Sequence, residues 1–230
     1  MNNIIAIVSK VLRKIFYQHE GRFRWDIVAE PGKTIIDMGC GEMKTAGVIG
    51  LDSRPEVNPD IITDLEGKIP LPDNSVDCVY ANHFLEHVEK LEEVMSEIYR
   101  ILKPDGRLRI FVPHFSNPYG YSDYTHKRFF GLFSFGYFCP VVYQKRLRIV
   151  PNYSQKISFN ITYEKLRFHS PLRIIYPLVI CLELVVNSNQ LFKTLYEYHF
   201  SYLFPIYGIQ IELSPLSKSD GTISTDIKTL

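Results

Sequence analysis

The stretch Lys33-Thr-Ile-Ile-Asp-Met-Gly-Cys-Gly41 decides how this chain folds. Residues 34–36 are β-branched and follow a Pro-Gly pair, which predicts a short, buried parallel strand. Asp37 stands at the carboxyl end of that strand, and Gly39 and Gly41 follow it. Glycine lets the backbone turn sharply and approach a ligand, because no Cβ stands in the way. We therefore expect a ligand site where this strand ends.

Two interpretations of the turn compete. A dinucleotide-binding turn has the pattern G-x-G-x-x-G, but here Lys44 occupies the third glycine position. The segment Asp37-Met38-Gly39-Cys40-Gly41 instead resembles the first motif, E/D-x-G-x-G, of class I S-adenosylmethionine (SAM) dependent methyltransferases. That resemblance implies SAM as cofactor and S-adenosylhomocysteine as product.

Further segments resemble this family in the expected order, from about residue 33 to residue 138. Residues 48–52 predict a second strand ending in Asp52, whose carboxylate suits two ribose hydroxyls. Residues 61–65 predict a third strand, and the resemblance places its acid, Asp64, at the adenine amine. Residues 71–80 resemble the family's P-F-x-D-x-S-F-D-x-V segment, and residues 102–110 resemble L-K-P-G-G-x-L-x-I. The candidate cofactor-binding residues are Asp37, Gly39, Gly41, Asp52, Asp64, Leu65, Asn82 and His83.

The resemblance implies an α/β fold with a Rossmann-like sheet of six parallel strands and one antiparallel strand. Only residues 39–46 join the first two strands, which is too short for a crossover with a helix, so the first crossover helix is vestigial or absent. Lys44 in this connection either faces the SAM carboxylate or is solvated. Alternation over 156–169 predicts strand six, and 206–213 predict strand seven, antiparallel at the sheet edge.

The chain divides into a core and attached segments. We expect an N-terminal amphipathic helix and linker (1–32), a SAM-binding core (33–169), a helical cap insertion (170–205), the last core strand (206–213) and a disordered tail (214–230). The helix carries Lys10, Arg13 and Lys14 on its polar side, so it packs as a lid or lies on a membrane surface. Residues 172–186 are apolar but shorter than the roughly 18 residues of a membrane span. A buried cap helix, a homodimer face and a peripheral membrane contact remain alternatives for them.

Composition narrows the class of partner. The 230 residues carry a net charge of only +1, so we expect no nucleic-acid partner, because binding to phosphates relies on clustered Lys and Arg. Four scattered cysteines suit reduced thiols, which predicts a cytoplasmic enzyme, free or peripheral at the membrane.

The segment after strand five, residues 113–130, combines histidines, an acid, hydroxyls and aromatics where α/β sheets place ligands. Small methyltransferases have a D-x-x-H-x-R-x-F segment here, matched by Asp123, His126, Arg128 and Phe130. We predict His114 or His126 as the catalytic base, with Asp123 orienting one of them or holding the acceptor. The alternatives are that these residues bind a divalent cation or only pin the loop. Histidine suits Mg²⁺ poorly, so we expect no metal.

The acceptor is not encoded in any motif. We predict O-methylation of a small-molecule or sugar hydroxyl, partly because short methyltransferases with a similar segment resemble polysaccharide and natural-product tailoring enzymes. The alternatives are methylation of a protein or RNA, and a SAM-binding scaffold subunit without catalysis.

Overall fold

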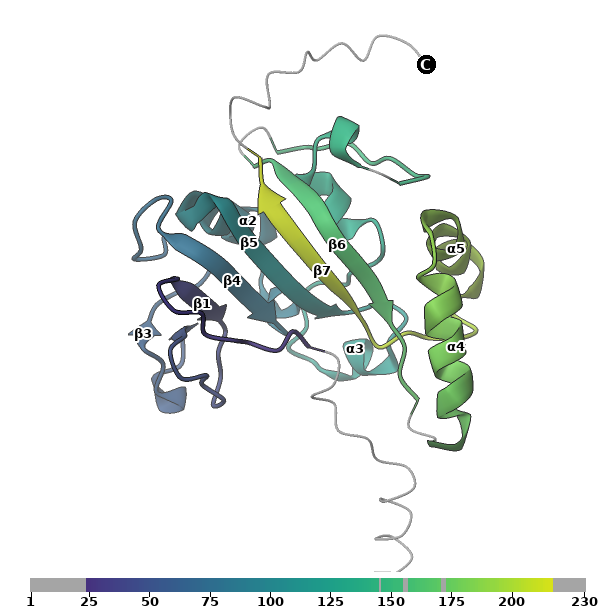
Figure 1. The fold of residues 1–230 in the computed structure, drawn as a ribbon. Coiled ribbons are helices and arrows are strands. Elements are labelled where there is room, and N and C mark those ends of the chain that lie inside the picture. Colours follow the sequence, from purple (N-terminus) through teal and green to yellow (C-terminus); the bar gives the residue numbers. More distant parts are fainter. Residues whose placement is uncertain (1–23, 145, 155–156, 171–172, 217–230) are drawn as a thin grey trace, which may run out of the picture.

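The protein is organised around one seven-stranded sheet (Figure 1). The computed structural model describes residues 24–144, 146–154, 157–170 and 173–216. The strand order is β3-β2-β1-β4-β5-β7-β6. The strands are β1 (Ile35–Met38), β2 (Ile49–Asp52), β3 (Ile61–Ile62), β4 (Val76–Asn82), β5 (Leu102–Pro113), β6 (Phe159–Arg167) and β7 (Gly208–Pro215). The α-helices are α2 (Leu91–Ile101), α3 (Pro118–Ser122), α4 (Tyr176–Val186) and α5 (Gln190–Leu195).

The sheet confirms the predicted fold class and corrects one strand position. Neighbours from β3 to β5 pair in parallel, and β7 is antiparallel to both β5 and β6. The sequence analysis placed the antiparallel strand at the edge, which is wrong: β7 lies between β5 and β6, and β6 is the edge strand. In this position both sides of the β7 backbone are hydrogen-bonded. β7 also runs to Pro215, past the predicted start of the tail.

The first connection is short, as predicted, and contains no helix within the described residues 39–48. The segment 24–30 packs on this side of the sheet instead, with Trp25, Ile27 and Ala29 against a small cluster around Ile35 and Tyr80. Gly47 has a positive φ of 79°, and a Cβ added to it would stand 2.9 Å from the Cβ of Ala29. The predicted N-terminal amphipathic helix lies outside the described residues.

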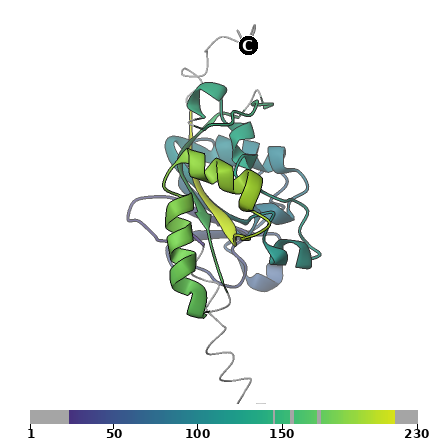
Figure 2. The ribbon, with the colours of Figure 1, turned by 90° about the vertical axis from the view of Figure 1, so that its right-hand side faces the viewer.

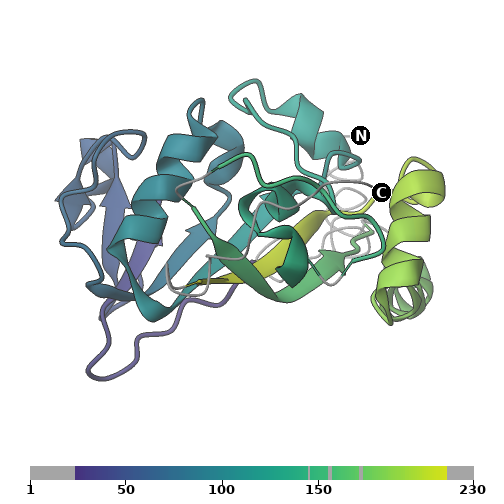
Figure 3. The same ribbon diagram turned by 90° about the horizontal axis from the view of Figure 1, so that it is seen from above.

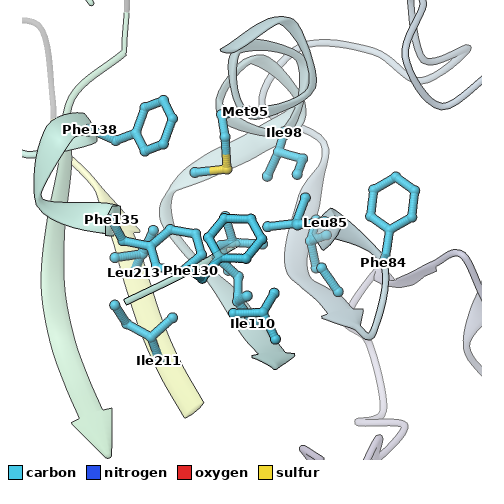
Figure 4. Close-up of a cluster of buried hydrophobic side chains, with 14 of the residues drawn as sticks. Phe84, Leu85, Met95, Ile98, Ile110, Phe130, Phe135, Phe138, Ile211 and Leu213 are labelled. Carbon is cyan, nitrogen blue, oxygen red and sulfur yellow. The ribbon is translucent and has the colours of Figure 1, made fainter. Parts of the chain in front are cut away.

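The opposite face of the sheet carries the main core, under α2. Val94, Met95, Ile98 and Ile101 of this helix are fully buried, as their helical spacing predicts. Figure 4 shows Met95 and Ile98 above β5 and β7, with three phenylalanines, Phe130, Phe135 and Phe138, filling the space beside them. The core therefore depends on the last residue of the 113–130 segment and on residues shortly after it.

A helical insertion between β6 and β7 lies beside the β6 edge, as Figures 1, 2 and 3 show from three directions. It comprises a 3₁₀ turn (Arg173–Ile175), α4, α5 and a π-helical turn (Tyr196–Phe200). Glu183 of α4 forms ion pairs with Lys165 and Arg167 of β6 at 2.9 and 3.0 Å. The Asn187 amide bonds both backbone groups of Leu166 at 2.8 Å, which satisfies part of the open strand edge.

Helix length limits what the insertion can do in a membrane. Within the described residues no single helix is long and apolar enough to cross a bilayer; α4 and residues 190–200 reach that length and composition only together, as a pair bent by 113°.

Candidate active site

The turn after β1 forms the first part of the site. Asp37 is 5% exposed, and this burial raises the pKa of its carboxyl to about 7, although the charge of Arg24 works in the opposite direction. Gly39 has a φ of 67°, and a Cβ there would stand 2.8 Å from the Phe84 ring. The turn therefore requires glycine and holds an acid of unusually high pKa at the carboxyl edge of the sheet.

Asp52, at the end of β2, is held ready as an acceptor. Its Oδ2 accepts a hydrogen bond from the Gly41 backbone N–H at 3.1 Å, and its Oδ1 accepts from the Arg54 backbone at 3.0 Å. The Arg54 guanidinium adds bonds of 3.2 and 3.3 Å. Burial alone would raise the pKa of Asp52, but these hydrogen bonds hold it below its usual value. The side chain of Arg54 is 57% exposed, so a diol can displace it.

The other candidates near this edge have local partners. Asp64 follows β3, is exposed, and its Oδ1 accepts a bond from the Glu66 N–H at 2.9 Å; Leu65 is 4% exposed. Lys44 is bound to neighbouring residues of the chain. Its ammonium bonds the Asp60 carboxylate at 2.9 Å and the backbone oxygen of Asn58 at 2.8 Å.

Asn82 is the last residue of β4 and His83 follows it, and the two side chains have different surroundings. The Asn82 amide pairs with the backbone of Trp25 through bonds of 3.0 and 3.1 Å, and the Trp25 indole donates to the Ile110 carbonyl at 2.9 Å. Asn82 thus holds the 24–30 segment against the sheet. Sequence analysis treated this segment as a linker and did not predict the contact. His83 adopts a positive φ of 54°, a strained conformation that is common at functional sites. Its Nδ1 lies 3.1 Å from Glu86 Oε1.

His114 is not available as a base, which corrects the sequence prediction. Its side chain is 0% exposed. The backbone N–H of Ser116 donates to Nδ1 at 3.1 Å, so the ring proton lies on Nε2, which donates to Glu197 Oε2 at 3.0 Å. Glu197 comes from the π-helical turn of the insertion and also accepts the Leu132 N–H at 2.8 Å. His114 therefore links the end of β5 to the insertion and cannot contact an acceptor.

His126 keeps one nitrogen without a hydrogen bond to a described residue. Its Nδ1 donates to the Gly120 carbonyl at 2.8 Å, and its Nε2 lies 3.7 Å from Asp123 Oδ2, beyond hydrogen-bond distance. Asp123 Oδ1 accepts the Thr125 hydroxyl and N–H at 2.6 and 2.9 Å, bonds that lower the pKa of Asp123. Asp123 therefore orients Thr125 directly and does not bond His126.

Two further residues of this region, Glu86 and His87, were not among the site residues predicted from the sequence. One ligand atom from each of Glu86, His87 and His126 lies within 4.8 Å of the others. The backbone N–H groups of Lys127 and Arg128 donate to the Glu86 carbonyl at 2.7 and 3.0 Å, which brings the two segments together. The available signal was position, because Glu86 and His87 lie in the 3₁₀ turn a few residues after the end of β4.

Exposed aromatic side chains surround this part of the chain. Tyr121 and Phe129 stack with their ring centroids 4.6 Å apart, and both are at least half exposed. Tyr119 and Tyr124 are also exposed, Tyr124 almost completely. Such rings provide apolar contact area with polar ends for a ligand.

Comparisons with known proteins match one part of the chain to a known domain. Residues 36–110 match a family model described as a methyltransferase domain. Sterol 24-C-methyltransferase of Yarrowia lipolytica is 26% identical over 181 residues, 68% of this chain and 47% of the relative. The ubiquinone/menaquinone biosynthesis C-methyltransferase UbiE of Escherichia fergusonii is 30% identical over 92 residues, 40% of this chain and 33% of the relative. The chain thus spans less than half the length of these curated relatives.

A solved structure supports the fold over most of the chain. The methyltransferase in complex with the Haloferax volcanii Trm112 methyltransferase activator aligns with a TM-score of 0.53 and 15% identity. The alignment covers 91% of this chain and 94% of that one. At this identity the likeness concerns the fold alone.

Proposed function

We propose that this chain, which carries a class I SAM-dependent methyltransferase domain, methylates a hydroxyl group of a small-molecule or sugar acceptor. The observation that carries the proposal is the pairing of two features at one sheet edge: the Asp37–Gly41 turn with the aligned carboxylate of Asp52, and the nearby Glu86, His87 and His126. When bound, SAM supplies a methyl group already activated by its sulfonium. The chain's own part is to hold, orient and shield the reactants.

The residues at the ends of β1 and β2 fit this cofactor. Asp52 offers both carboxylate oxygens to two neighbouring hydroxyls once Arg54 moves aside. Gly39 and Gly41 keep the backbone free of side chains beside it. Asp64 at the end of β3 is assigned to the adenine amine by the family resemblance, and its exposed position is compatible with that contact.

On the acceptor side, His126 is the remaining candidate base. Its Nδ1 holds the proton, so Nε2 has the lone pair that would take the acceptor's hydroxyl proton. A positioned base of this kind accelerates transfer by typically about 100 to 10,000-fold. The exposed rings of Tyr121 and Phe129 support an acceptor with an apolar face, such as a sugar ring or a phenol.

The insertion supports an acceptor presented at a membrane. Its charged side chains between 174 and 204, Glu183, Lys193 and Glu197, all turn inward, with exposures of 15, 6 and 9%. Large apolar side chains cover its outside instead, among them Ile174, Leu178, Leu184, Tyr202 and Leu203. A surface this apolar is unusual on a monomer in water. We propose a peripheral contact with a bilayer and a lipid-linked acceptor, in keeping with the lipid pathways in the relatives' names.

The first test of the cofactor is calorimetric titration with S-adenosylhomocysteine, with Asp52→Ala as the comparison. We expect micromolar binding by the intact chain and none by the variant. Transfer from radiolabelled SAM to pools of glycolipids, free sugars, RNA and protein then identifies the acceptor class. Label in RNA or protein would overturn the small-molecule assignment, and binding without transfer to any pool would favour a scaffold subunit.

The membrane contact is tested by co-sedimentation with vesicles of neutral and anionic phospholipid. We expect the chain to sediment with them, and the double variant Leu184→Ser with Tyr202→Ser to remain in solution. Leu147→Ser removes an equally exposed apolar side chain outside the insertion and should sediment normally. A dimer in solution that ignores vesicles and dissociates in the double variant would assign this surface to a second copy of the chain.

A further inference from the structure

We infer that Glu86, His87 and His126 form a binding site for one divalent transition-metal ion. The inference starts from the side chains themselves, whose ligand atoms lie within 4.8 Å of one another. It runs against the expectation from sequence that the protein uses no metal. Its functional role rests on the proposed function, because the site adjoins the strand end assigned to the cofactor.

The hydrogen bonds of His87 leave its Nε2 as a ligand. His87 Nδ1 lies 3.0 Å from the Thr125 hydroxyl oxygen. The single proton of that hydroxyl is donated to the Asp123 carboxylate at 2.6 Å, so Thr125 can only accept from His87. The proton of the His87 ring is therefore on Nδ1, and its Nε2 has no hydrogen-bond partner among the residues that the structure describes.

His126 is held in the same state by a different partner. A backbone carbonyl only accepts hydrogen bonds, so the contact of 2.8 Å between His126 Nδ1 and the Gly120 oxygen places the proton on Nδ1. Fixing the outer ring nitrogen by a carbonyl or a hydrogen-bonded chain to a carboxylate is the arrangement that orients metal-binding histidines. Both rings of the cluster have it, and the rings meet edge to face with centroids 4.8 Å apart.

Glu86 supplies the third ligand. Its residue exposure is 1%, and Oε1 bonds His83 while Oε2 is buried with no hydrogen-bond partner among the residues that the structure describes. Leaving a buried carboxylate oxygen without a donor is costly. Glu86 Oε2 and the Nε2 atoms of the two histidines thus have no hydrogen-bond donor among the described residues, and one ligand atom of each residue lies within 4.8 Å of the others. One cation can therefore bind all three side chains.

The ligand types narrow the choice of ion. Two imidazoles and one carboxylate suit Zn²⁺, Mn²⁺, Fe²⁺ or Co²⁺ better than Mg²⁺ or Ca²⁺, which prefer oxygen. Such a set occupies one side of the ion and leaves positions open. An acceptor hydroxyl bound there would be oriented, and its pKa lowered, by the ion, so His126 would act as a ligand and the hydroxyl proton would leave to solvent.

The site can be tested by binding alone. Full-length chain, stripped with chelator and free of affinity tags, is titrated with Zn²⁺ and with Co²⁺ by calorimetry, and the Co²⁺ form is followed by its visible absorption. We expect one ion per chain. Glu86→Gln and His126→Gln should each weaken binding by at least about 100-fold, and Thr125→Val, which removes an orienting partner, by about 10-fold. His199→Gln removes an exposed histidine outside the cluster and should change nothing.

Two controls keep the outcomes distinct. Circular dichroism and binding of S-adenosylhomocysteine show that each variant is folded and that the cofactor site is intact. Failure of both ions to bind, or binding that survives Glu86→Gln and His126→Gln, overturns the metal site. Loss of cofactor binding by the unmodified chain would instead refute the methyltransferase proposal and leave the metal result standing.

Discussion

Two halves of the molecule differ in how their chemistry is positioned. In the cofactor half, residues 35–65, Asp37 lies within β1, Asp52 ends β2 and Asp64 follows β3, so each strand carries its acid toward the sheet edge. In the acceptor half, residues 114–130 and 173–204, two histidines of one loop have opposite surroundings. His114 is buried and hydrogen-bonded to Glu197, 83 positions later, whereas His126 keeps one nitrogen without a hydrogen bond to a described residue. The comparison teaches that a strand end predicts a site residue from sequence, while a loop residue depends on distant partners.

The largest expected effect is a loss of methyl transfer without a loss of cofactor binding, caused by a change in the acceptor half alone. His126→Gln should lower kcat by about 100 to 10,000-fold, whether the ring acts as base or as metal ligand. Affinity for S-adenosylhomocysteine should stay unchanged, because His126 lies outside the cofactor half. Transfer assays and calorimetry on the same preparations measure the two quantities, with His199→Gln as the matched control. A parallel loss of cofactor affinity would show that the halves are not separable.

The second largest expected effect concerns Asp37 in the cofactor half, whose pKa of about 7 makes the stability of the protein depend on pH. An acid with a raised pKa holds its proton longer in the folded than in the unfolded chain. The stability of the ligand-free protein should therefore fall as pH rises from about 4 to about 7. Asp37→Asn avoids this cost and should be more stable at pH 8, by up to about 4 kcal/mol for a shift from 3.8 to about 7, but no more stable at pH 4.

The same residue should couple ligand binding to protons. SAM is cationic, so its binding should favour ionised Asp37 and release a proton below pH 7. Calorimetry in buffers of different ionisation enthalpy measures this release, and Asp37→Asn should abolish both it and tight binding. Proton uptake, or no linkage at all, would contradict the assigned position of this carboxyl.

A smaller effect should show that His114 contributes to stability and His126 to catalysis. His114→Leu leaves Glu197 without one of its buried donors, which should lower the free energy of unfolding by about 2 kcal/mol in urea titrations. The folded variant should keep the wild-type pH profile of kcat, because His114 touches no acceptor. A changed profile would return His114 to the list of catalytic candidates and weaken the contrast between the two histidines.

The smallest expected effect concerns Arg54, whose guanidinium donates hydrogen bonds to the Asp52 carboxylate. Arg54→Ala should tighten binding of S-adenosylhomocysteine by up to about fivefold, because the exposed guanidinium of Arg54 must leave Asp52 before the ligand binds. Arg107→Ala removes one positive charge from a residue paired with Glu212 instead and is the control for net charge. Weaker binding by Arg54→Ala would show that the arginine contacts the ligand.

Much of the fold was predictable because its signals are local. β-branched runs ending in an acid or a glycine marked β1 and β2, and helical spacing marked α2. The short connection before β2 excluded a first helix by length alone. The interior position of β7 was not predictable, since no residue in 208–215 states which two strands it will pair with.

The sequence by itself determined the sheet and the acids at its edge, because a strand's end and the residue that follows it are set within a few positions of the chain. Only the tertiary structure decided the chemistry of the histidines. Burial of His114 by Glu197, and the tautomers of His87 and His126 set by Thr125 and Gly120, all depend on contacts across the fold. The protonation state and access of an imidazole follow from those partners, and nothing in its sequence neighbourhood specifies them.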